Sequence, residues 1–280
     1  MAMELVLGAV AYDAKVVPIW EGFRAYFETR GLAFDYVLFS NYERQVEAQL
    51  AGAIDVAWNS PLAWIETERA APGRARAIAM RDTDRDLTSV VLAKPGVRTL
   101  ADLRGQRVAV GAADSPQATL IPLVAFAEAG LLPGDADDRP GRDIEVVRHD
   151  VHVGKHGDHV GGERDAVRAL LEGRADAACV IDGNRLAFAR EGLFAPNALA
   201  VVHQTPPYDH CNFTVVTSSP AIDRFRELLL AMSYDDPAVR PLLDMEGLKQ
   251  WRDGRTTGYA QLARAVDRFK TIEAWLARQR

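Results

Sequence analysis

The sequence predicts an α/β protein built as two lobes, each with a mostly parallel sheet flanked by helices. Short apolar runs of strand length alternate with longer runs in which apolar residues recur at helical spacing. A polar stretch at 81–86 marks a first crossover between lobes, and the expected strand 211–217 marks the return. The pattern Gly-x-x-Asp-x-Ala at 52–57 recurs at 173–178, each time after a helical run and before an apolar strand. This weak internal repeat indicates two similarly built lobes.

The expected elements follow from the local pattern and from residues typical of helix ends. Gly31 and Gly52 are placed to end helices, and Glu43 lies in a first turn, where the helix dipole favours a carboxylate. Strands are expected at 4–10, 34–39, 54–59, 75–80, 87–93, 107–112, 144–148, 177–181, 199–203 and 211–217. Helices are expected at 16–27, 42–50, 61–70, 99–104, 116–129, 163–172 and 185–190, and the chain after 217 is expected to be helical throughout. The first lobe would comprise residues 1–84 and 206–280, and the second residues 85–205.

Composition excludes several classes of protein. The chain has 280 residues and a net charge of −6, with no basic stripe, so nucleic acid is not an expected partner. No apolar run of about 18 residues suggests a membrane span. Its first residues lack a basic region followed by a long apolar stretch, so a cytoplasmic location is expected as written, and a periplasmic one if an export signal has been removed. Two cysteines do not make a disulfide framework, and no cofactor is expected.

Two helices are predicted to begin with Ser-Pro directly after a strand, at Ser60 and at Ser115. Serine is a favoured N-cap and proline a favoured first helical residue, so plain capping explains each dipeptide taken alone. A helix N-terminus at the carboxyl edge of a sheet also offers N–H groups to an anion. We therefore expect both helix starts to face a shared ligand crevice.

Four of the six histidines fall in one polar segment, at His149, His152, His156 and His159. Imidazoles, with carboxylates nearby, are ligands for zinc, nickel, copper or iron. The spacing lies on a glycine-bearing stretch rather than a clear helix, so a solvated loop is the alternative reading. A single histidine that reaches the crevice, His159, would contact an anion or move a proton.

The segment Tyr208–Asn212 places His210 beside Cys211 at a strand entrance. Such a pair can act as nucleophile and base. Adjacent residues on a strand point to opposite faces, so we expect the two side chains not to cooperate. No Gly-x-Ser-x-Gly, P-loop or Gly-x-Gly-x-x-Gly is present, so a serine hydrolase or a nucleotide-binding fold has no motif support.

With its alternating elements, two crossovers and helical tail, the chain resembles the type 2 periplasmic-binding-protein fold, and most of all the phosphonate-binding branch of ABC-transporter solute receptors. The resemblance covers most of residues 4–235. It implies that residues 114–119 grip an anion, that Tyr12 or Tyr42 with Asn59 and Ser60 closes on it, and that Asp182 is an acid of the second lobe. The chain departs from the family pattern because Asp114 lies beside a loop with only one serine and one threonine.

The expected function is that of a solute-binding protein that closes two lobes on a small anionic or zwitterionic ligand: a phosphonate, a phosphate-like ion or a carboxylate. The ligand is the expected partner, with an ABC-transporter permease as a possible second one. Expected ligand-binding residues are Tyr12, Tyr42, Asn59, Ser60, Ser115, Gln117, Thr119, His159, Glu163, Asp182 and His210.

Two alternatives stay open. The same fold is used by cytoplasmic lyases and decarboxylases of small carboxylates, for which His159, His210 or Asp182 would be the acid or base. The other alternative is a metal-binding receptor that uses the histidine-rich segment between His149 and His159.

Overall fold

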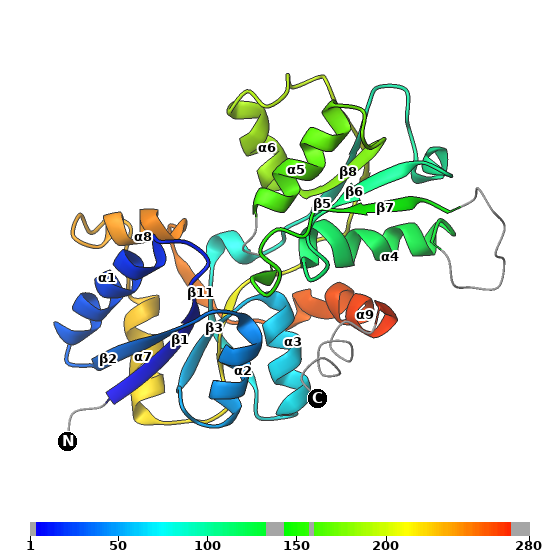
Figure 1. The fold of residues 1–280 in the computed structure, drawn as a ribbon. Helices are drawn as coiled ribbons and strands as arrows, with labels where there is room; N and C mark the ends of the chain where they lie inside the picture. Colours follow the sequence, from blue (N-terminus) through cyan, green and yellow to red (C-terminus); the bar gives the residue numbers. More distant parts are fainter. Residues whose placement is uncertain (1–3, 133–142, 157–159, 270–280) are drawn as a thin grey trace. The chain divides into compact units, whose positions relative to one another are not determined.

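A computed structural model describes residues 4–132, 143–156 and 160–269 of the chain (Figure 1). Within these residues the chain forms two compact units. Unit 1 contains residues 4–85 and 209–259, and unit 2 contains residues 86–208 and 260–269. Each unit has its own sheet and its own hydrophobic core, as the two-lobe α/β prediction requires.

Unit 1 is built on a six-stranded sheet in the order β11-β4-β10-β3-β1-β2. Its strands are β1 (Glu4–Val10), β2 (Ala33–Phe39), β3 (Val56–Asn59), β4 (Arg76–Arg81), β10 (Asn212–Val215) and β11 (Trp251–Asp253). The pairs of β1 with β2 and with β3 are parallel, whereas β10 and β11 run antiparallel to their neighbours. The carboxyl ends of β1, β2 and β3 therefore share one edge of this sheet.

Helices cover both faces of the unit 1 sheet. They are α1 (Val16–Glu28), α2 (Tyr42–Leu50), α3 (Pro61–Ala70), α7 (Pro220–Leu230) and α8 (Arg240–Glu246), with short 3-10 turns η1 (Asp82–Asp84) and η5 (Thr257–Tyr259). One core joins α1, α7 and α8 to the sheet through stacked aromatics, in which Phe27 and Phe225 have ring centroids 5.1 Å apart. A smaller cluster around Tyr42 and Val46 packs α2 and α3 against the opposite face.

Unit 2 holds a five-stranded sheet in the order β7-β6-β8-β5-β9. Its strands are β5 (Ser89–Ala93), β6 (Arg107–Val110), β7 (Glu145–Arg148), β8 (Ala177–Ile181) and β9 (Ala200–Gln204). Its helices are η2 (Leu100–Leu103), the π-helical turn η3 (Pro116–Leu120), α4 (Ile121–Glu128), α5 (Val160–Leu171), α6 (Asp182–Arg190) and α9 (Ala260–Phe269). Alternate strand residues face two cores: Val90 packs towards α5 and α6, and Val91 towards α4.

The repeated Gly-x-x-Asp-x-Ala has the same structural role in both units. Gly52 and Gly173 end helices with φ of 75° and 77°, which glycine adopts without strain. The Asp55 carboxylate then accepts a 2.8 Å hydrogen bond from the backbone N–H of Val6 in β1, and Asp176 accepts one of 2.9 Å from Arg107 in β6. Each aspartate thus fixes the start of a central strand, β3 or β8, against its parallel neighbour. The internal repeat therefore reflects two sheets built in the same order.

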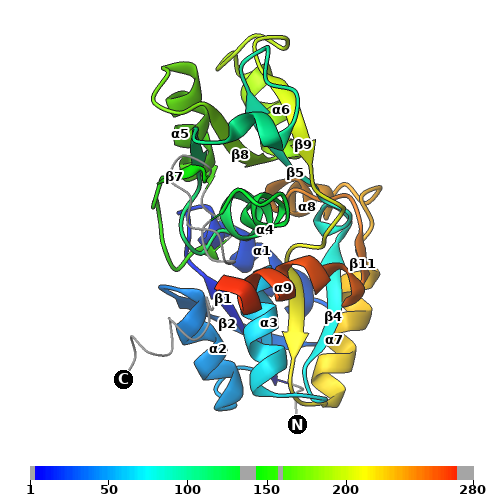
Figure 2. The ribbon, with the colours of Figure 1, turned by 90° about the vertical axis from the view of Figure 1, so that its right-hand side faces the viewer.

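The structure differs from the sequence-based expectation in the last third of the chain. The segment expected to be helical throughout contains β11, which pairs with β4 at the edge of the unit 1 sheet. Helix α9 was expected in the first lobe, but it packs on α4 and η3 in unit 2 (Figure 2). Its amphipathic stripe predicted a packed helix but not the partner, because apolar periodicity does not specify which surface is covered.

We expect Gly254→Ala to destabilise unit 1 by about 2 kcal/mol or more, because a Cβ there would lie 2.0 Å from the backbone oxygen of Ala77 and the strand cannot move away. Gly183→Ala is the control, since a Cβ at that helical position meets nothing within 4 Å, and it should be neutral or stabilise by about 0.5 kcal/mol. Urea denaturation followed by tryptophan fluorescence measures both changes. Equal stabilities for the two variants would contradict the prediction.

Candidate functional site

A capped turn follows the carboxyl end of β6 in unit 2; it spans residues 115–120 and is called the Ser115 turn below. The Ser115 hydroxyl oxygen accepts a 3.2 Å hydrogen bond from the N–H of Ala118, and the Ser115 carbonyl accepts 3.2 and 2.9 Å bonds from Thr119 and Leu120. A Cβ on Gly111 would lie 2.8 Å from that of Ala118, so glycine at 111 lets the turn pack closely on the strand end. The predicted serine N-cap and the proline after it are confirmed.

The Ser115 turn presents hydroxyl groups from buried side chains. Ser115 and Thr119 are 1% and 3% exposed. The Ser115 hydroxyl accepts a bond with its oxygen, so its hydrogen is left for another acceptor. Thr119 Oγ1 is buried and has no hydrogen-bond partner among the described residues. Both groups can therefore donate to an oxygen of a bound anion.

A buried carboxylate holds the side chain between these two hydroxyls. Glu163 in the first turn of α5 is 1% exposed and accepts a 3.1 Å hydrogen bond from Gln117 Nε2. Its other oxygen accepts from the N–H of Ile181 at 2.9 Å and from Asn184 Nδ2 at 3.1 Å. These three donors compensate the buried negative charge. Sequence reasoning did not single out Asn184 as part of this network, although it stands among the polar residues that follow β8.

The loop after β7 is fastened to the residues that precede the Ser115 turn. Asp114 accepts a 2.5 Å hydrogen bond from the N–H of Gly154, and Asp150 accepts one of 2.9 Å from the N–H of Ala113. Burial lowers the pKa of His149 at the end of β7, which favours its neutral form near pH 7. His149 Nε2 is buried without a hydrogen-bond partner among the described residues.

The predicted histidine metal site is only partly visible, because His159 lies outside the described residues. Of the others, His152 and His156 have φ of 58° and 47°, and His156 is buried. Within the described chain, one group of three side chains brings possible metal-ligating atoms within 4.8 Å of one another, and it contains none of these histidines. That group is Asp84, His210 and Cys211 in unit 1. The metal-receptor alternative is therefore supported only by the pattern of histidines in the sequence.

The Asp84–His210–Cys211 group corrects one expectation. Cys211 Sγ lies 3.1 Å from His210 Nδ1, so the expectation that these side chains point apart is wrong. The reason is that β10 begins at Asn212, and alternation does not hold before a strand begins. His210 Nδ1 also lies 3.5 Å from Asp84 Oδ1. Arg81 binds both oxygens of Asp84, at 2.6 and 3.0 Å, and so already supplies a cation there.

The residues expected to contact a ligand from unit 1 are mostly engaged inside it. Asn59 is fully buried; its Oδ1 accepts a 2.7 Å hydrogen bond from Gln45 Nε2, and its Nδ2 lies 3.4 Å from Thr67 Oγ1. Ser60 is also fully buried and caps α3 through Ala63. Tyr42 is 1% exposed in the core beneath α2. Tyr12 is partly exposed, with the Lys15 ammonium 5.5 Å from its ring.

The two predicted Ser-Pro helix starts do not occupy equivalent positions. Ser60 follows β3, whose counterpart in unit 2 is β8, which is followed by Asp182. Ser115 follows β6, whose counterpart is β1, which is followed by Tyr12. A third Ser-Pro start at Ser219 caps α7 with the same 3.2 Å bond. The dipeptide alone therefore marks a cap, and the buried Thr119 hydroxyl without a hydrogen-bond partner among the described residues distinguishes the Ser115 turn. Asp182 pairs with Arg185 at 2.6 Å.

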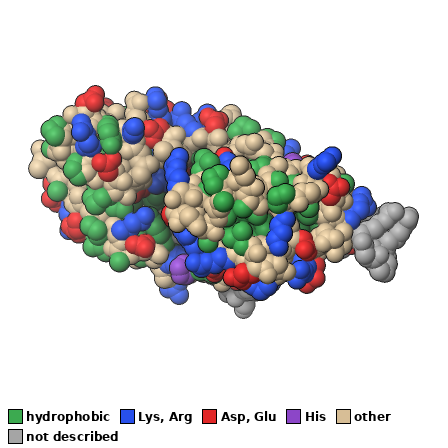
Figure 3. All heavy atoms as spheres, turned by 90° about the horizontal axis from the view of Figure 1, so that it is seen from above, with side chains coloured by type: hydrophobic (Ala, Val, Ile, Leu, Met, Phe, Trp, Pro, Cys, Tyr) green, Lys and Arg blue, Asp and Glu red, His purple; other side chains and the backbone are tan. Residues whose placement is uncertain are grey.

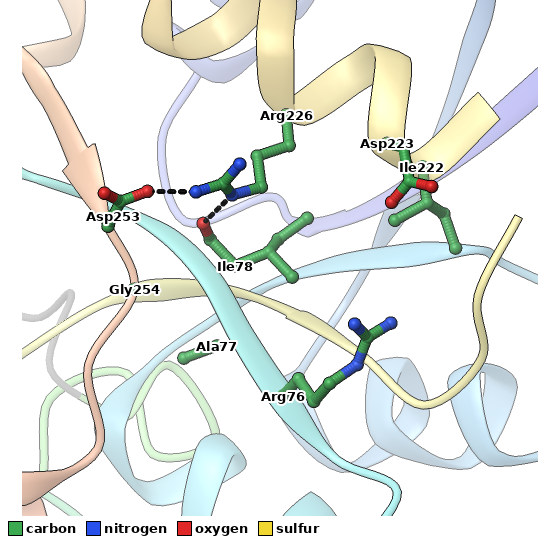
Figure 4. Close-up of a pocket in the computed structure, with 8 residues that line it drawn as sticks. All are labelled: Arg76, Ala77, Ile78, Ile222, Asp223, Arg226, Asp253 and Gly254. Atoms are coloured by element: carbon green, nitrogen blue, oxygen red, sulfur yellow. Dashed lines mark hydrogen bonds and ion pairs between the residues drawn. The ribbon is translucent and has the colours of Figure 1, made fainter. Parts of the chain in front are cut away.

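A surface pocket of about 330 Å³ lies beside β4 in unit 1 (Figure 4). Both of its arginines are engaged: Arg76 donates to the carbonyl of Thr217 at 2.9 Å, and Arg226 to the carbonyl of Ile78 and to Asp253. The pocket is lined by Arg76, Ala77, Ile78, Ile222, Asp223, Arg226, Asp253 and Gly254. With two arginines and two aspartates, the lining is near electrical balance. On the face shown in Figure 3, basic and acidic side chains are likewise interspersed.

None of the helices in the described part of the chain is both long enough and apolar enough to span a bilayer.

Comparison with known proteins gives the class to which this fold belongs. PhnD1 from Prochlorococcus marinus, in complex with methylphosphonate, matches with a TM-score of 0.68 and 16% identity over 96% of this chain and 99% of that one. A Xanthomonas citri protein bound to ATP matches with a TM-score of 0.70 and 19% identity over 96% and 98%. The periplasmic aliphatic sulphonate binding protein SsuA from Escherichia coli matches with a TM-score of 0.58 and 16% identity over 98% and 89%. The chain has the type 2 periplasmic-binding-protein fold, as predicted.

A match to the amino-acid sequence identifies the family. A family model described as "ABC transporter, phosphonate, periplasmic substrate-binding protein" matches residues 9–259. The chain belongs to this family of transporter substrate-binding proteins, and its role is to bind a solute.

The acid stability of unit 1 should depend on Asp84. Burial raises the pKa of this carboxyl, but Arg81 and His210 lower it more strongly, to about 2. An unfolded aspartate titrates near 3.9, so the ionised group contributes about 2 kcal/mol, which is present above pH 4 and is lost as the pH falls towards 2. Asp84→Asn should flatten this part of the stability profile, measured by urea denaturation between pH 5 and pH 2.5. Asp165→Asn, on the exposed face of α5, is the control; an unchanged profile in Asp84→Asn would contradict the assignment.

Proposed function

We propose that this chain binds a small phosphonate-type anion at the Ser115 turn. The observation that carries the proposal is the pair of buried hydroxyls, on Ser115 and Thr119, whose hydrogens can point to a ligand oxygen. The family match supports a phosphonate-type ligand, and the methylphosphonate complex of PhnD1 concerns a protein of the same fold.

The charges around the Ser115 turn limit the class of ligand. Residues 111–120 contain no lysine or arginine, while Asp114 and Glu163 place carboxylates beside and beneath the turn. Neutral hydroxyl donors cannot balance a polyanion, so a small ligand with low net charge, or a zwitterion that carries an ammonium group, fits better than a nucleotide. Although the Xanthomonas citri relative was solved with ATP, the chemistry here favours a methylphosphonate-sized or aminoalkylphosphonate ligand.

Ligand contact by other residues stays a prediction; these are Tyr12, Tyr42, Asn59, Ser60, Asp182, His159 and His210. Among those in unit 1, Tyr12 is the most accessible. We propose a periplasmic location and delivery to an ABC-transporter permease, because both belong to the family's role. The family match also favours this role over the lyase alternative.

Isothermal titration calorimetry with methylphosphonate, 2-aminoethylphosphonate, phosphate, methanesulfonate and acetate tests the proposal. Hydrogen bonds to a charged ligand contribute about 1.5–3 kcal/mol. Ser115→Ala and Thr119→Val should therefore each lower the affinity for the tightest ligand about tenfold or more.

Ser219→Ala is the matched control, because it removes the same capping hydroxyl before a proline at α7. It should lower stability slightly and leave affinity unchanged. If no phosphonate binds, or if Ser115→Ala and Ser219→Ala bind alike, the Ser115 turn is not the anion site.

A further inference from the structure

One carbonyl in the Ser115 turn, that of Gln117, cannot accept the hydrogen bond that the π-helical pattern would supply. In the π-helical pattern the N–H of each residue bonds to the carbonyl five residues earlier, as Leu120 does with Ser115 and Ile121 with Pro116. The next donor in this series, for the carbonyl of Gln117, would be residue 122, which is a proline without an N–H. Since Ile121 already donates to Pro116, neither residue 121 nor residue 122 supplies this bond, and a side chain donates to the Gln117 carbonyl.

Ser89, at the start of β5, supplies that donor. Its hydroxyl donates to the Gln117 carbonyl at 2.6 Å, and the Tyr208 hydroxyl lies 2.8 Å from the same Ser89 oxygen. Serine has one hydroxyl hydrogen, so Tyr208 must be the donor in the second bond. Burial raises the pKa of Tyr208, which keeps this phenol protonated. The result is a buried series of hydrogen bonds, in which Tyr208 donates to Ser89 and Ser89 donates to Gln117.

Tyr208, at the far end of this hydrogen-bond series, lies where the polypeptide passes from one unit to the other. Tyr208 is the last residue of unit 2 before the return crossover, and its backbone exchanges two 2.8 Å hydrogen bonds with Leu87 beside the first crossover. Ser89 is fixed in turn by a 3.0 Å bond from its N–H to Thr205 Oγ1. Ser89, which donates to the Ser115 turn, and Tyr208, which donates to Ser89, are therefore both held by residues beside the crossover segments.

We propose that Ser89 and Tyr208 are positioning residues for ligand binding: together they set the geometry of the Ser115 turn through their hydrogen bonds to the Gln117 carbonyl, to which Pro122 cannot donate. They do not touch the ligand. Solute affinity then depends on this hydrogen-bond chain and, through Tyr208, on the crossover segments. The proposal rests on the proposed function only for its effect on affinity, because its effect on the turn can be measured without ligand.

The test uses Ser89→Ala, Tyr208→Phe and the double variant Ser89→Ala/Pro122→Ala. Ser89→Ala should weaken methylphosphonate binding about tenfold, and Tyr208→Phe by a smaller factor. In the double variant residue 122 regains an N–H that can donate to Gln117, so most of the lost affinity should return. Loss of packing at Ser89 alone would not be repaired by a change at 122. Tyr26→Phe, which removes a phenol bonded to the Leu228 carbonyl in unit 1, is the matched control and should bind normally.

Hydrogen–deuterium exchange of the ligand-free protein separates this proposal from the proposed function. In Ser89→Ala the amides of residues 118–121 should exchange about tenfold faster, and in the double variant at nearly the wild-type rate. Unchanged exchange in Ser89→Ala overturns the positioning role. Normal affinity in Ser89→Ala, or no recovery in the double variant, overturns the link to binding. If the wild type binds no phosphonate, the proposed function fails and the exchange data alone decide the positioning role.

Discussion

The candidate site depends on one constraint: the backbone polar groups of a buried turn must be satisfied although one proline lies in the turn and another follows it. Pro116 and Pro122 remove two N–H groups from the stretch that follows β6. At the start of the turn the hydroxyl and carbonyl oxygens of Ser115 accept hydrogen bonds from the N–H groups of Ala118, Thr119 and Leu120. In the middle of the turn the Ser89 hydroxyl donates to the Gln117 carbonyl. The resulting π-helical geometry is a feature often found at functional sites.

The rest of unit 2 supports this turn through hydrogen bonds to carboxylates. Glu163 holds Gln117 from below, and the loop after β7 holds the residues before the turn through Asp114 and Asp150. Every carboxylate in this arrangement accepts a hydrogen bond from a backbone or amide donor. A site of this kind distinguishes ligands by the placement of their oxygens and by size more than by long-range attraction.

The sequence predicted the fold class, the family and the position of the Ser115 turn, because these depend on patterns that repeat along the chain. Apolar periodicity located nearly every strand and helix, and the Gly-x-x-Asp-x-Ala repeat indicated two similar sheets. It did not predict β11, since three residues are too few to show a period. Nor did it predict that Cys211 contacts His210, because that contact depends on where β10 begins.

The burial of Asn59 and the role of Ser89 could not be predicted for a different reason. Each depends on a partner far away in the sequence or on a proline that removes one specific donor. Which donor meets which acceptor can be identified only from the three-dimensional structure. The sequence also could not show that Ser60 and Ser115 are not equivalent. The same dipeptide follows strands at different positions in the two sheets.

The aspartate clamps at Asp55 and Asp176 secure the sheets at the amino ends of β3 and β8, whereas the Ser115 turn lies past the carboxyl end of β6. In unit 2 the framework contact, at the amino ends of β8 and β6, and the proposed recognition turn thus lie at opposite ends of the sheet. Loops at the recognition end can change during evolution without disturbing what holds the sheet in register. This chain shares only 16% of its residues with PhnD1 and with SsuA yet has the same fold, although one was solved with methylphosphonate and the other is an aliphatic sulphonate binding protein.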